Sequence, residues 1–137
     1  MATLNEKIRR LLGPCHFILE KGKSSKRFRA LINEMSSLSN ALGCLSEVEI
    51  NCTTHQEACW QNFWTRFGAT LDDCEETLEK LDNILQGVDQ LDNMDNGSAT
   101  EIRDVLRPRI VPLSKAVTIA FELNTLFVHL SNIAYEF

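Results

Sequence analysis

Residues 60–88 read WQNFWTRFGATLDDCEETLEKLDNILQGV and decide the fold expected of this chain. Their apolar side chains recur at alternating steps of four and three, as Trp60, Trp64, Phe67, Leu71, Cys74, Leu78, Leu81, Leu85 and Val88. This spacing predicts one long helix with an apolar seam. Opposite charges are missing beside the seam, and Phe63 and Ile84 broaden it. A helical bundle is therefore favoured over an isolated coiled coil.

The segments before residue 60 also have helical spacing, and none of them alternates as a strand does. Residues 4–12 predict a short helix that ends at Gly13-Pro14, with a second short piece after the proline. Residues 26–45 predict a longer helix. Its single apolar stripe consists of Phe28, Leu31, Met35, Leu38, Leu42 and Leu45.

The last segment starts near Thr100, and interruptions are expected at Pro108 and Pro112. Its first apolar stripe is Ile110, Leu113, Val117, Ala120 and Asn124, and its second is Ile119, Leu123, Leu126, Leu130 and Ile133. A helix that is apolar on two sides is typical of the centre of a bundle, so residues 113–133 are predicted to lie there. The polar residues Glu122, Asn124 and His129 argue against a membrane span.

Together these segments predict an all-α, up-and-down bundle of four to five helices with one long heptad-patterned helix. The length of 137 residues suits a single domain over 1–137. Within it we expect a basic N-terminal helical arm at 1–25 and a core bundle at 26–137.

The net charge of −5 conceals a strong asymmetry along the chain. Residues 1–29 hold eight basic and two acidic side chains, while the remainder holds six basic and 17 acidic ones. Three interpretations stay open: the arm binds an anionic membrane surface, it is a solvated face, or it lies against the acidic third helix of its own bundle. The candidates for anionic contact are Lys21, Lys23, Lys26, Arg27 and Arg29. Nucleic acid is not expected as a partner, because the acidic body would repel phosphate.

No residue pattern indicates catalysis, so we expect neither an enzyme, nor a cofactor, nor a small-molecule substrate. Phosphate-binding loops, dinucleotide-binding loops and the common hydrolase motifs are missing from the sequence. Cys44, Cys52, His55 and Cys59 have the donor types of a zinc site but match no standard spacing, so metal binding there is left open. Cys15, His16 and Cys74 are interpreted as structural residues.

The N-terminus MATLNEKIRR has no apolar leader, so no signal peptide is expected. Five cysteines, an odd number at irregular spacing, then indicate reduced thiols in a cytoplasmic protein.

Three stretches together resemble a known family. They are KRFRALINEMSSLSNALGCLSEVE (26–49), FWTRFGATLDDCEETLEKLDNILQG (63–87) and IRDVLRPRIVPLSKAVTIAFELNTLF (102–127). Over roughly residues 15–130 the chain is similar to the fungal helical N-terminal domains of the HeLo-like group, which precede NACHT or ankyrin regions. The resemblance implies an all-α signalling or death-effector module of fungal self/non-self recognition. It also implies self-association and, for some members, attack on membranes after oligomerisation.

Two functions follow as hypotheses. The first is a non-enzymatic interaction module that binds a protein partner or a second copy of itself. Its candidate contact residues are Trp60, Phe63, Trp64 and Phe67, since aromatic side chains anchor interfaces, although the same rings could equally fill one end of the core. The alternative is a membrane-acting effector that uses residues 4–29 as a cationic amphipathic segment, with membrane association on activation.

Overall fold

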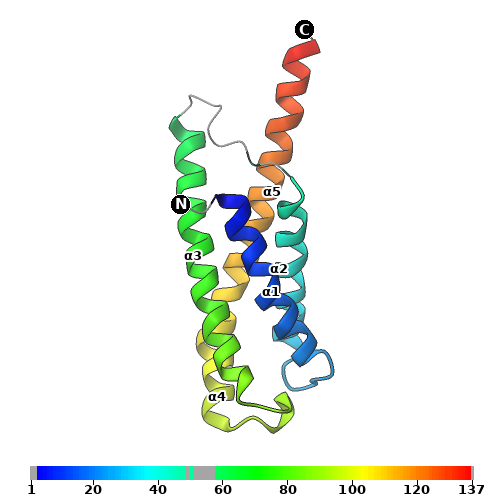
Figure 1. Cartoon of the computed structure of the whole chain (residues 1–137), viewed down its shortest axis with the longest axis vertical. Helices are drawn as coiled ribbons and strands as arrows, with labels where there is room; N and C mark the ends of the chain where they lie inside the picture. Colours follow the sequence, from blue (N-terminus) through cyan, green and yellow to red (C-terminus); the bar gives the residue numbers. More distant parts are fainter. Residues whose placement is uncertain (1–2, 49, 51–57, 137) are drawn as a thin grey trace.

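Four long rods run up and down through the molecule, as the apolar spacing predicted (Figure 1). The computed structural model describes residues 3–48, 50 and 58–136, without the side chains of 58–59 and 131–136. The described residues contain no strand, which confirms the all-α fold class. The first rod, α1, packs against α2 and α3, while the last rod, α5, packs extensively against α2 and less extensively against α3.

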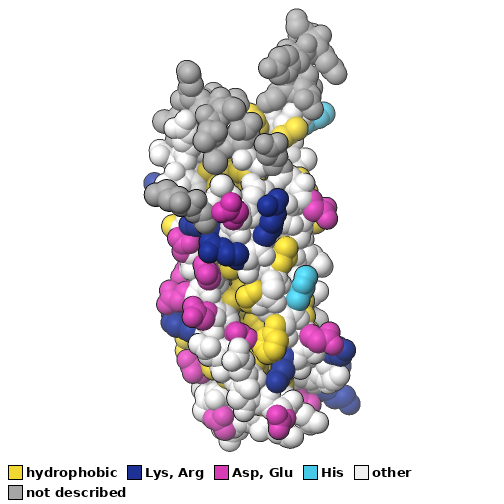
Figure 2. Space-filling model, in the orientation of Figure 1, with side chains coloured by type: hydrophobic (Ala, Val, Ile, Leu, Met, Phe, Trp, Pro, Cys, Tyr) yellow, Lys and Arg dark blue, Asp and Glu magenta, His cyan; other side chains and the backbone are white. Residues whose placement is uncertain are grey.

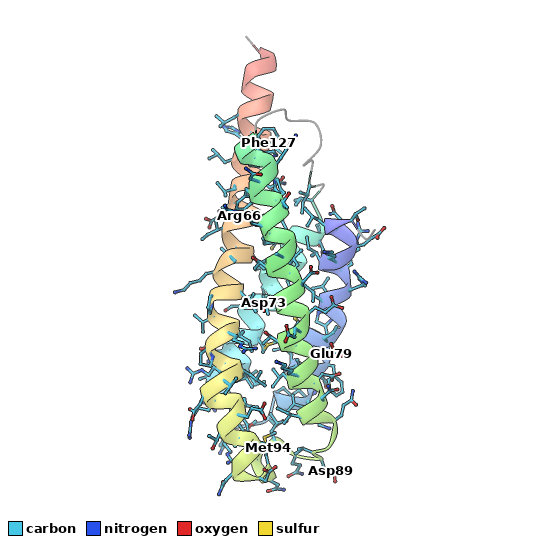
Figure 3. The ribbon with its side chains drawn as sticks, turned by 90° about the vertical axis from the view of Figure 1, so that its left-hand side faces the viewer. Arg66, Asp73, Glu79, Asp89, Met94 and Phe127 are labelled. Atoms are coloured by element: carbon cyan, nitrogen blue, oxygen red, sulfur yellow. The ribbon has the colours of Figure 1, made fainter. Side chains whose placement is uncertain are left out.

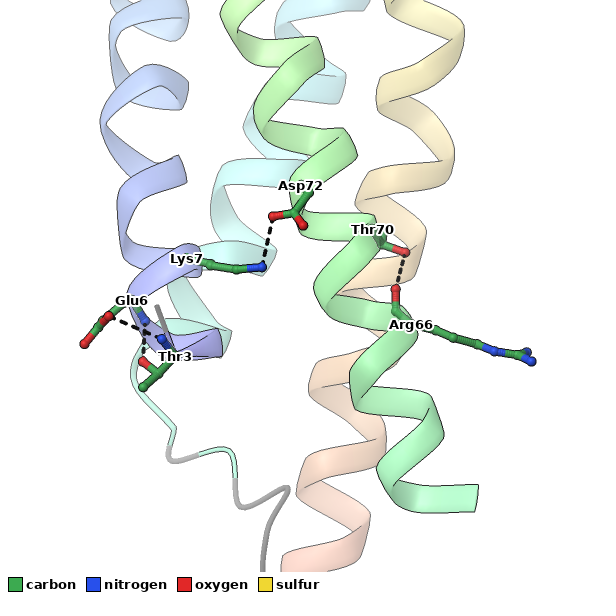
Figure 4. Close-up of polar contacts among 6 residues, drawn as sticks. All are labelled: Thr3, Glu6, Lys7, Arg66, Thr70 and Asp72. Carbon is green, nitrogen blue, oxygen red and sulfur yellow. Dashed lines mark hydrogen bonds and ion pairs between the residues drawn. The ribbon is translucent and has the colours of Figure 1, made fainter. Parts of the chain in front are cut away.

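Helix α1 spans Leu4–Gly22 as one continuous helix. Thr3 caps it: the Thr3 hydroxyl accepts the Glu6 N–H at 3.1 Å, and the Glu6 carboxylate accepts the Thr3 N–H at 3.3 Å (Figure 4). Such a reciprocal pair satisfies two main-chain donors that the first turn leaves free.

The predicted break of the first helix at Gly13-Pro14 is wrong, because Pro14 lies inside α1. The buried side of α1 extends on both sides of the proline and consists of Ile8, Leu11, Cys15 and Ile18. A proline in a helix removes one main-chain hydrogen bond and crowds the preceding turn. The apolar burial along the whole length of α1 outweighs this local cost.

Helix α2 spans Arg29–Ser46 and begins three residues later than the predicted start at residue 26. The turn before it is held by Ser25, whose hydroxyl accepts the Phe28 N–H at 3.2 Å. All six members of the predicted stripe are buried. The stripe was therefore read correctly, although the start of the helix was not.

Helix α3 spans Ala58–Gln86 and is the long heptad-patterned helix of the prediction. Its seam from Trp64 to Leu85 is buried against the other rods. The side chains on its opposite side, such as Arg66, Asp73 and Glu79, point away from the bundle (Figure 3). This arrangement fits a helix of a bundle better than a helix of an isolated coiled coil.

The final rod is built from three consecutive pieces: α4 (Asn96–Glu101), a π-helical turn η2 (Ile102–Leu106) and α5 (Arg107–Glu136). A short 3₁₀ turn, η1 (Leu91–Asn93), precedes it. The expected interruption at Pro112 is wrong, since α5 continues through this residue.

The π-helical turn has two physical causes in the sequence. Pro108 cannot donate a main-chain hydrogen bond, and its ring would crowd the carbonyl of Asp104 in α-helical geometry. In addition, Ile102, Leu106 and Ile110 are all fully buried although they are separated by steps of four and four. Two such steps drift by about 80° around the axis of an α-helix, and a wider π-helical turn reduces this drift, so the three side chains stay closer to one face.

The prediction that α5 lies at the centre of the bundle with both stripes covered is wrong. Its first stripe, from Ile110 to Asn124, is buried, but Ile119, Leu126 and Leu130 of the second stripe are 51%, 53% and 55% exposed. Within the described part of the chain, four rods form a ring and no fifth rod lies outside α5. One side of α5 is therefore not covered by any other described helix.

Candidate interaction surface

An aromatic cluster joins the start of α3 to α5. The rings of Trp60 and Phe127 lie 4.7 Å apart between centroids, and Trp64 makes edge contacts with Phe63 at 5.0 Å and with Phe67 at 5.6 Å. Trp64 and Phe67 are buried, whereas Trp60 and Phe63 are half-buried. The four predicted contact residues are thus brought together, and two of them lie in the core.

Trp64 combines deep burial with an unused polar group. Its side chain is 2% exposed, and its indole Nε1 has no hydrogen-bond partner among the described residues. A buried donor without a partner costs about 1–3 kcal/mol. The apolar packing of this large ring must offset that cost, which indicates that Trp64 serves the contact between helices.

The predicted cationic residues meet at the turn between α1 and α2, and Arg27 is the one most fully engaged by the fold. Its guanidinium donates to the Met94 carbonyl at 2.9 Å and to the Asn96 side chain at 3.4 Å. The Asp92 carboxylate accepts hydrogen bonds from the Ser25 hydroxyl and the Arg27 N–H, and these bonds lower the pKa of Asp92. Arg27 therefore links the turn between α1 and α2 to the turn that precedes α4.

The other predicted cations divide into two groups. Lys23 pairs with Glu20 of the preceding turn, and Lys21 is half-buried. Lys26 and Arg29 are exposed, and within the described residues no ion pair joins them to an acidic side chain. Of the five candidates, these two remain the most available to an anionic surface.

A cavity of about 160 Å³ lies beside this turn and is bordered by three arginines, Arg27, Arg103 and Arg107. Arg103 donates to Asp104 at 3.0 Å, and Arg107 donates to both carboxylate oxygens of Glu34 at 3.2 Å. With Arg27 held as described above, all three guanidinium groups have partners within the protein. Arg107 thereby joins α5 to α2, and Arg27 joins the two turns, whereas Arg103 pairs within η2.

One residue of the basic arm, Lys7, lies against the acidic helix α3, as one of the three interpretations expects. Lys7 of α1 donates to Asp72 of α3 at 3.0 Å (Figure 4). Basic and acidic side chains are interspersed over the face seen in Figure 2. An exposed pair of this kind adds little to stability. It does reduce the positive charge that α1 presents to solvent.

The most unusual surface is the uncovered side of α5, which we call the outer stripe: Pro112, Ala116, Ile119, Leu123, Leu126 and Leu130. Pro112 and the three large residues Ile119, Leu126 and Leu130 are exposed, while Ala116 and Leu123 are half-buried. The stripe extends the second stripe of the sequence by two residues toward the N-terminus. Ile133, the last member predicted, lies outside the described side chains. The upper end of α5 also projects beyond α1 and α2 (Figure 1).

The sequence contained a signal for this extended stripe that the prediction did not use. From Pro112 to Leu130 the steps are four, three, four, three and four, the alternation that characterises a helix–helix seam. The exposed Lys115 and Glu122 lie along one edge of the stripe, seven residues apart. The opposite edge faces the aromatic cluster, where Phe127 contacts Trp60.

The buried cysteines have the properties of packed apolar residues. Burial raises the pKa of Cys15 to about 12, and burial together with the neighbouring Cys15, Asp73 and Glu75 raises the pKa of Cys74 to about 12. Thiols with such a high pKa are not reactive nucleophiles at neutral pH. His16, next to Cys15 in sequence, is exposed.

The metal-binding hypothesis falls on residues that the structure largely leaves out. Cys52 and His55 lie outside the described residues, as does the side chain of Cys59, while Cys44 is exposed. Among the residues that are described, no group of three metal-ligating side chains comes together.

One helical region, Asn96–Leu130, contains an 18-residue window with a mean hydropathy of 1.3, of which 28% is buried. By length and composition alone this region could cross a bilayer, although the sequence predicted no such span. Core helices of soluble proteins pass the same test.

Comparison with known proteins finds no matching family model, no matching curated protein and no matching solved structure. The resemblance to fungal HeLo-like domains stays a prediction from the sequence.

Proposed function

We propose that this chain is a non-enzymatic protein-interaction module of a signalling type, and that it associates with a second copy of itself through the outer stripe of α5. The proposal rests on one observation: the outer stripe has the spacing of a helix–helix seam, and none of the described residues outside α5 covers it. Ile119, Leu126 and Leu130 each expose about half of their surface along it.

Exposed apolar surface of this kind has a clear energetic consequence. Removing apolar area from water is worth about 25 cal/mol per Å². Monomeric proteins seldom keep large contiguous apolar patches in water. The outer stripe is uncharged from Pro112 to Leu130, so a second apolar helix can cover it without desolvating an ion.

The same arrangement favours a protein partner over the membrane-acting alternative. That alternative needs the apolar side of residues 4–29, but Ile8, Leu11 and Ile18 are fully or almost fully buried between the rods. A membrane-acting segment would first have to leave the bundle and expose this core. The outer stripe, in contrast, is accessible in the folded chain. The resemblance to fungal signalling domains implies self-association, which is the association proposed for the outer stripe.

The decisive experiment measures the solution mass of the purified protein across a concentration series, by sedimentation equilibrium or light scattering. We expect the mass to rise from that of a monomer to that of a dimer. Ile119→Glu and Leu126→Glu should keep the protein monomeric, because each places a charge in the seam. Circular dichroism should be unchanged, since exposed positions tolerate substitution.

Phe17 offers a matched control. It is another exposed apolar residue, 39% accessible, but lies on α1. Phe17→Glu should leave the association unchanged. A wild-type protein that stays monomeric at the highest concentration would contradict the proposed function, and association that both stripe variants retain would place the contact elsewhere.

A further inference from the structure

The outer stripe also contains information on how two copies would be oriented. In a pair of parallel helices, each flanking edge of one seam meets the opposite edge of the other. In an antiparallel pair, which is related by a two-fold axis perpendicular to the helices, each flanking edge meets the same edge of the partner. The charges along the exposed edge of the stripe therefore distinguish the two orientations.

Lys115 and Glu122 carry opposite charges on that single edge, and both are exposed. Seven residues separate them, so they occupy equivalent positions one heptad apart. In an antiparallel pair centred near residue 118, Lys115 faces the partner's Glu122 and Glu122 faces the partner's Lys115. Symmetry makes both pairs at once.

In the parallel arrangement these charges meet no complementary partner. The opposite edge of the stripe is formed by residues such as Ala120 and Phe127, which contact the bundle itself. From the charges on the two edges we infer that the chain forms an antiparallel, two-fold symmetric dimer through α5, in which two Lys115–Glu122 ion pairs flank the seam. This inference rests on the proposed function and specifies its geometry.

Three of the four contact layers in this alignment pair apolar residues with each other, while in the fourth Leu126 lies beside the partner's Arg109, whose aliphatic stem can cover it. With the two-fold axis near residue 118, Ile119 lies beside the partner's Ala116, and Leu123 lies beside the partner's Pro112. Leu130 on the projecting end then reaches the partner's Val105, which is 44% exposed in the single chain. The axis also falls close to the middle of the continuous rod from Asn96 to Glu136, so the two rods overlap along almost their whole length.

A competing antiparallel alignment, centred near residue 121, pairs all six members of the outer stripe with one another. It places Glu122 opposite the partner's Glu122, however, and leaves Val105 uncovered. Like charges at such positions are unfavourable, and complementary charges select register. The alignment centred near residue 118 is therefore preferred.

The expected strength follows from the size of the contact. The stripe from Pro112 to Leu130 is about 27 Å long at 1.5 Å per residue. One helix pair of this length lies near the lower end of stable interfaces, which begin at about 1,000 Å². A reversible dimer with a dissociation constant in the micromolar range is expected.

Charge reversal tests the orientation directly. Lys115→Glu and Glu122→Lys should each weaken dimerisation about tenfold at low salt, because two attractive pairs become two repulsive ones. The double variant should restore wild-type affinity. The dissociation constants are measured by sedimentation equilibrium on the whole chain, with circular dichroism as a check of folding.

Arg66→Glu and Glu79→Lys serve as matched controls, since they make the same changes in net charge on the outer side of α3 (Figure 3). They should leave the dissociation constant close to the wild-type value. If the wild-type protein dimerises but the single reversals have no effect, the antiparallel alignment is wrong while self-association stands. If the wild-type protein is a monomer throughout, both this inference and the proposed function are wrong.

Discussion

The inner face of α5 lies against α2 and α3, whereas its outer face lies against solvent. Both faces repeat apolar residues at helical spacing, and both are free of charged residues over about three turns. Yet Val117 and Ala120 are completely buried, while Ile119, between them in sequence, is 51% exposed. The two faces therefore differ only in whether another helix is available to cover them.

This contrast separates two uses of an apolar side chain. On the inner face it stabilises the folded chain, because unfolding exposes it to water. On the outer face it contributes little to folding and can instead stabilise an association. Substitutions on the two faces should affect different measurements, and similar contrasts between covered and uncovered positions occur elsewhere in the bundle.

The largest contrast is expected for the cysteines. A thiol with a pKa near 12 is ionised to only about one part in ten thousand at pH 8, so Cys15 and Cys74 should resist iodoacetamide in the folded protein. The exposed Cys44 should react at least a hundredfold faster. Peptide mapping by mass spectrometry measures the three rates. Equal rates at Cys44 and Cys15 would show that the α1–α3 contact opens readily.

The next contrast compares the two faces of α5 directly. Ile110→Ala should lower the free energy of unfolding by about 2–5 kcal/mol, because it leaves a cavity in the core. Ile119→Ala should change it by no more than about 0.5 kcal/mol. Chemical denaturation at protein concentrations below self-association gives both values. A large loss with Ile119→Ala would mean that the outer face is covered within the monomer.

Two glycines provide a smaller contrast of the same kind. A Cβ at Gly22 would overlap the side chain of Ile32, so Gly22→Ala should destabilise the protein by about 1–3 kcal/mol through overpacking. A Cβ at Gly43, within α2, would have open space around it. Gly43→Ala should therefore stabilise the protein by up to about 1 kcal/mol, as expected for a helical position. Thermal unfolding distinguishes the two signs.

The smallest effect is expected at the solvent-exposed turns below α5. The Ser25 hydroxyl lowers the pKa of Asp92, and the Ser98 N–H lowers the pKa of Asp95. A carboxyl group whose pKa is lower in the folded state stabilises the fold above its unfolded pKa, and this contribution disappears as the pH falls below about 4. Between pH 6 and pH 2.5 the melting temperature of Asp92→Asn should fall slightly less than that of the wild-type protein. An identical decline would indicate that Asp92 loses its partners in solution.

Much of the fold could be predicted from the sequence, because apolar periodicity reports directly which side of a helix is buried. The seam of α3 and the stripe of α2 were both identified in this way. The break expected at Pro14 did not occur, since local helix preference is weaker than burial along the whole of α1. The start of α2 was also misplaced, because the turn before it is stabilised by long-range contacts to Asp92 and Met94.

The candidate site was less predictable, for a physical reason. Periodicity shows that a face of α5 is apolar, but it cannot show whether a neighbouring helix covers that face. Aromatic content directed attention to Trp60, Phe63, Trp64 and Phe67, of which Trp64 and Phe67 were needed inside the bundle. The outer stripe had the better seam spacing, and its alternation of four and three from Pro112 onward was the signal that could have identified it.

The π-helical turn at Ile102–Leu106 has a consequence for how this chain tolerates length changes. The turn holds one residue more than an α-helical turn would. This extra residue keeps the side chains of Ile102 and Ile110 on the same face of the helix. Deleting Asp104 would leave Ile102 and Ile110 seven residues apart, close to two α-helical turns, so both should stay buried, with Pro108 accommodated as Pro14 is in α1. The same deletion one or two turns later would rotate everything beyond it by about 100°, because each helical residue advances by 1/3.6 of a turn. Val117 and Ala120 would then leave the core. We therefore expect the deletion of Asp104 to be tolerated and a single-residue deletion one or two turns later to unfold the protein.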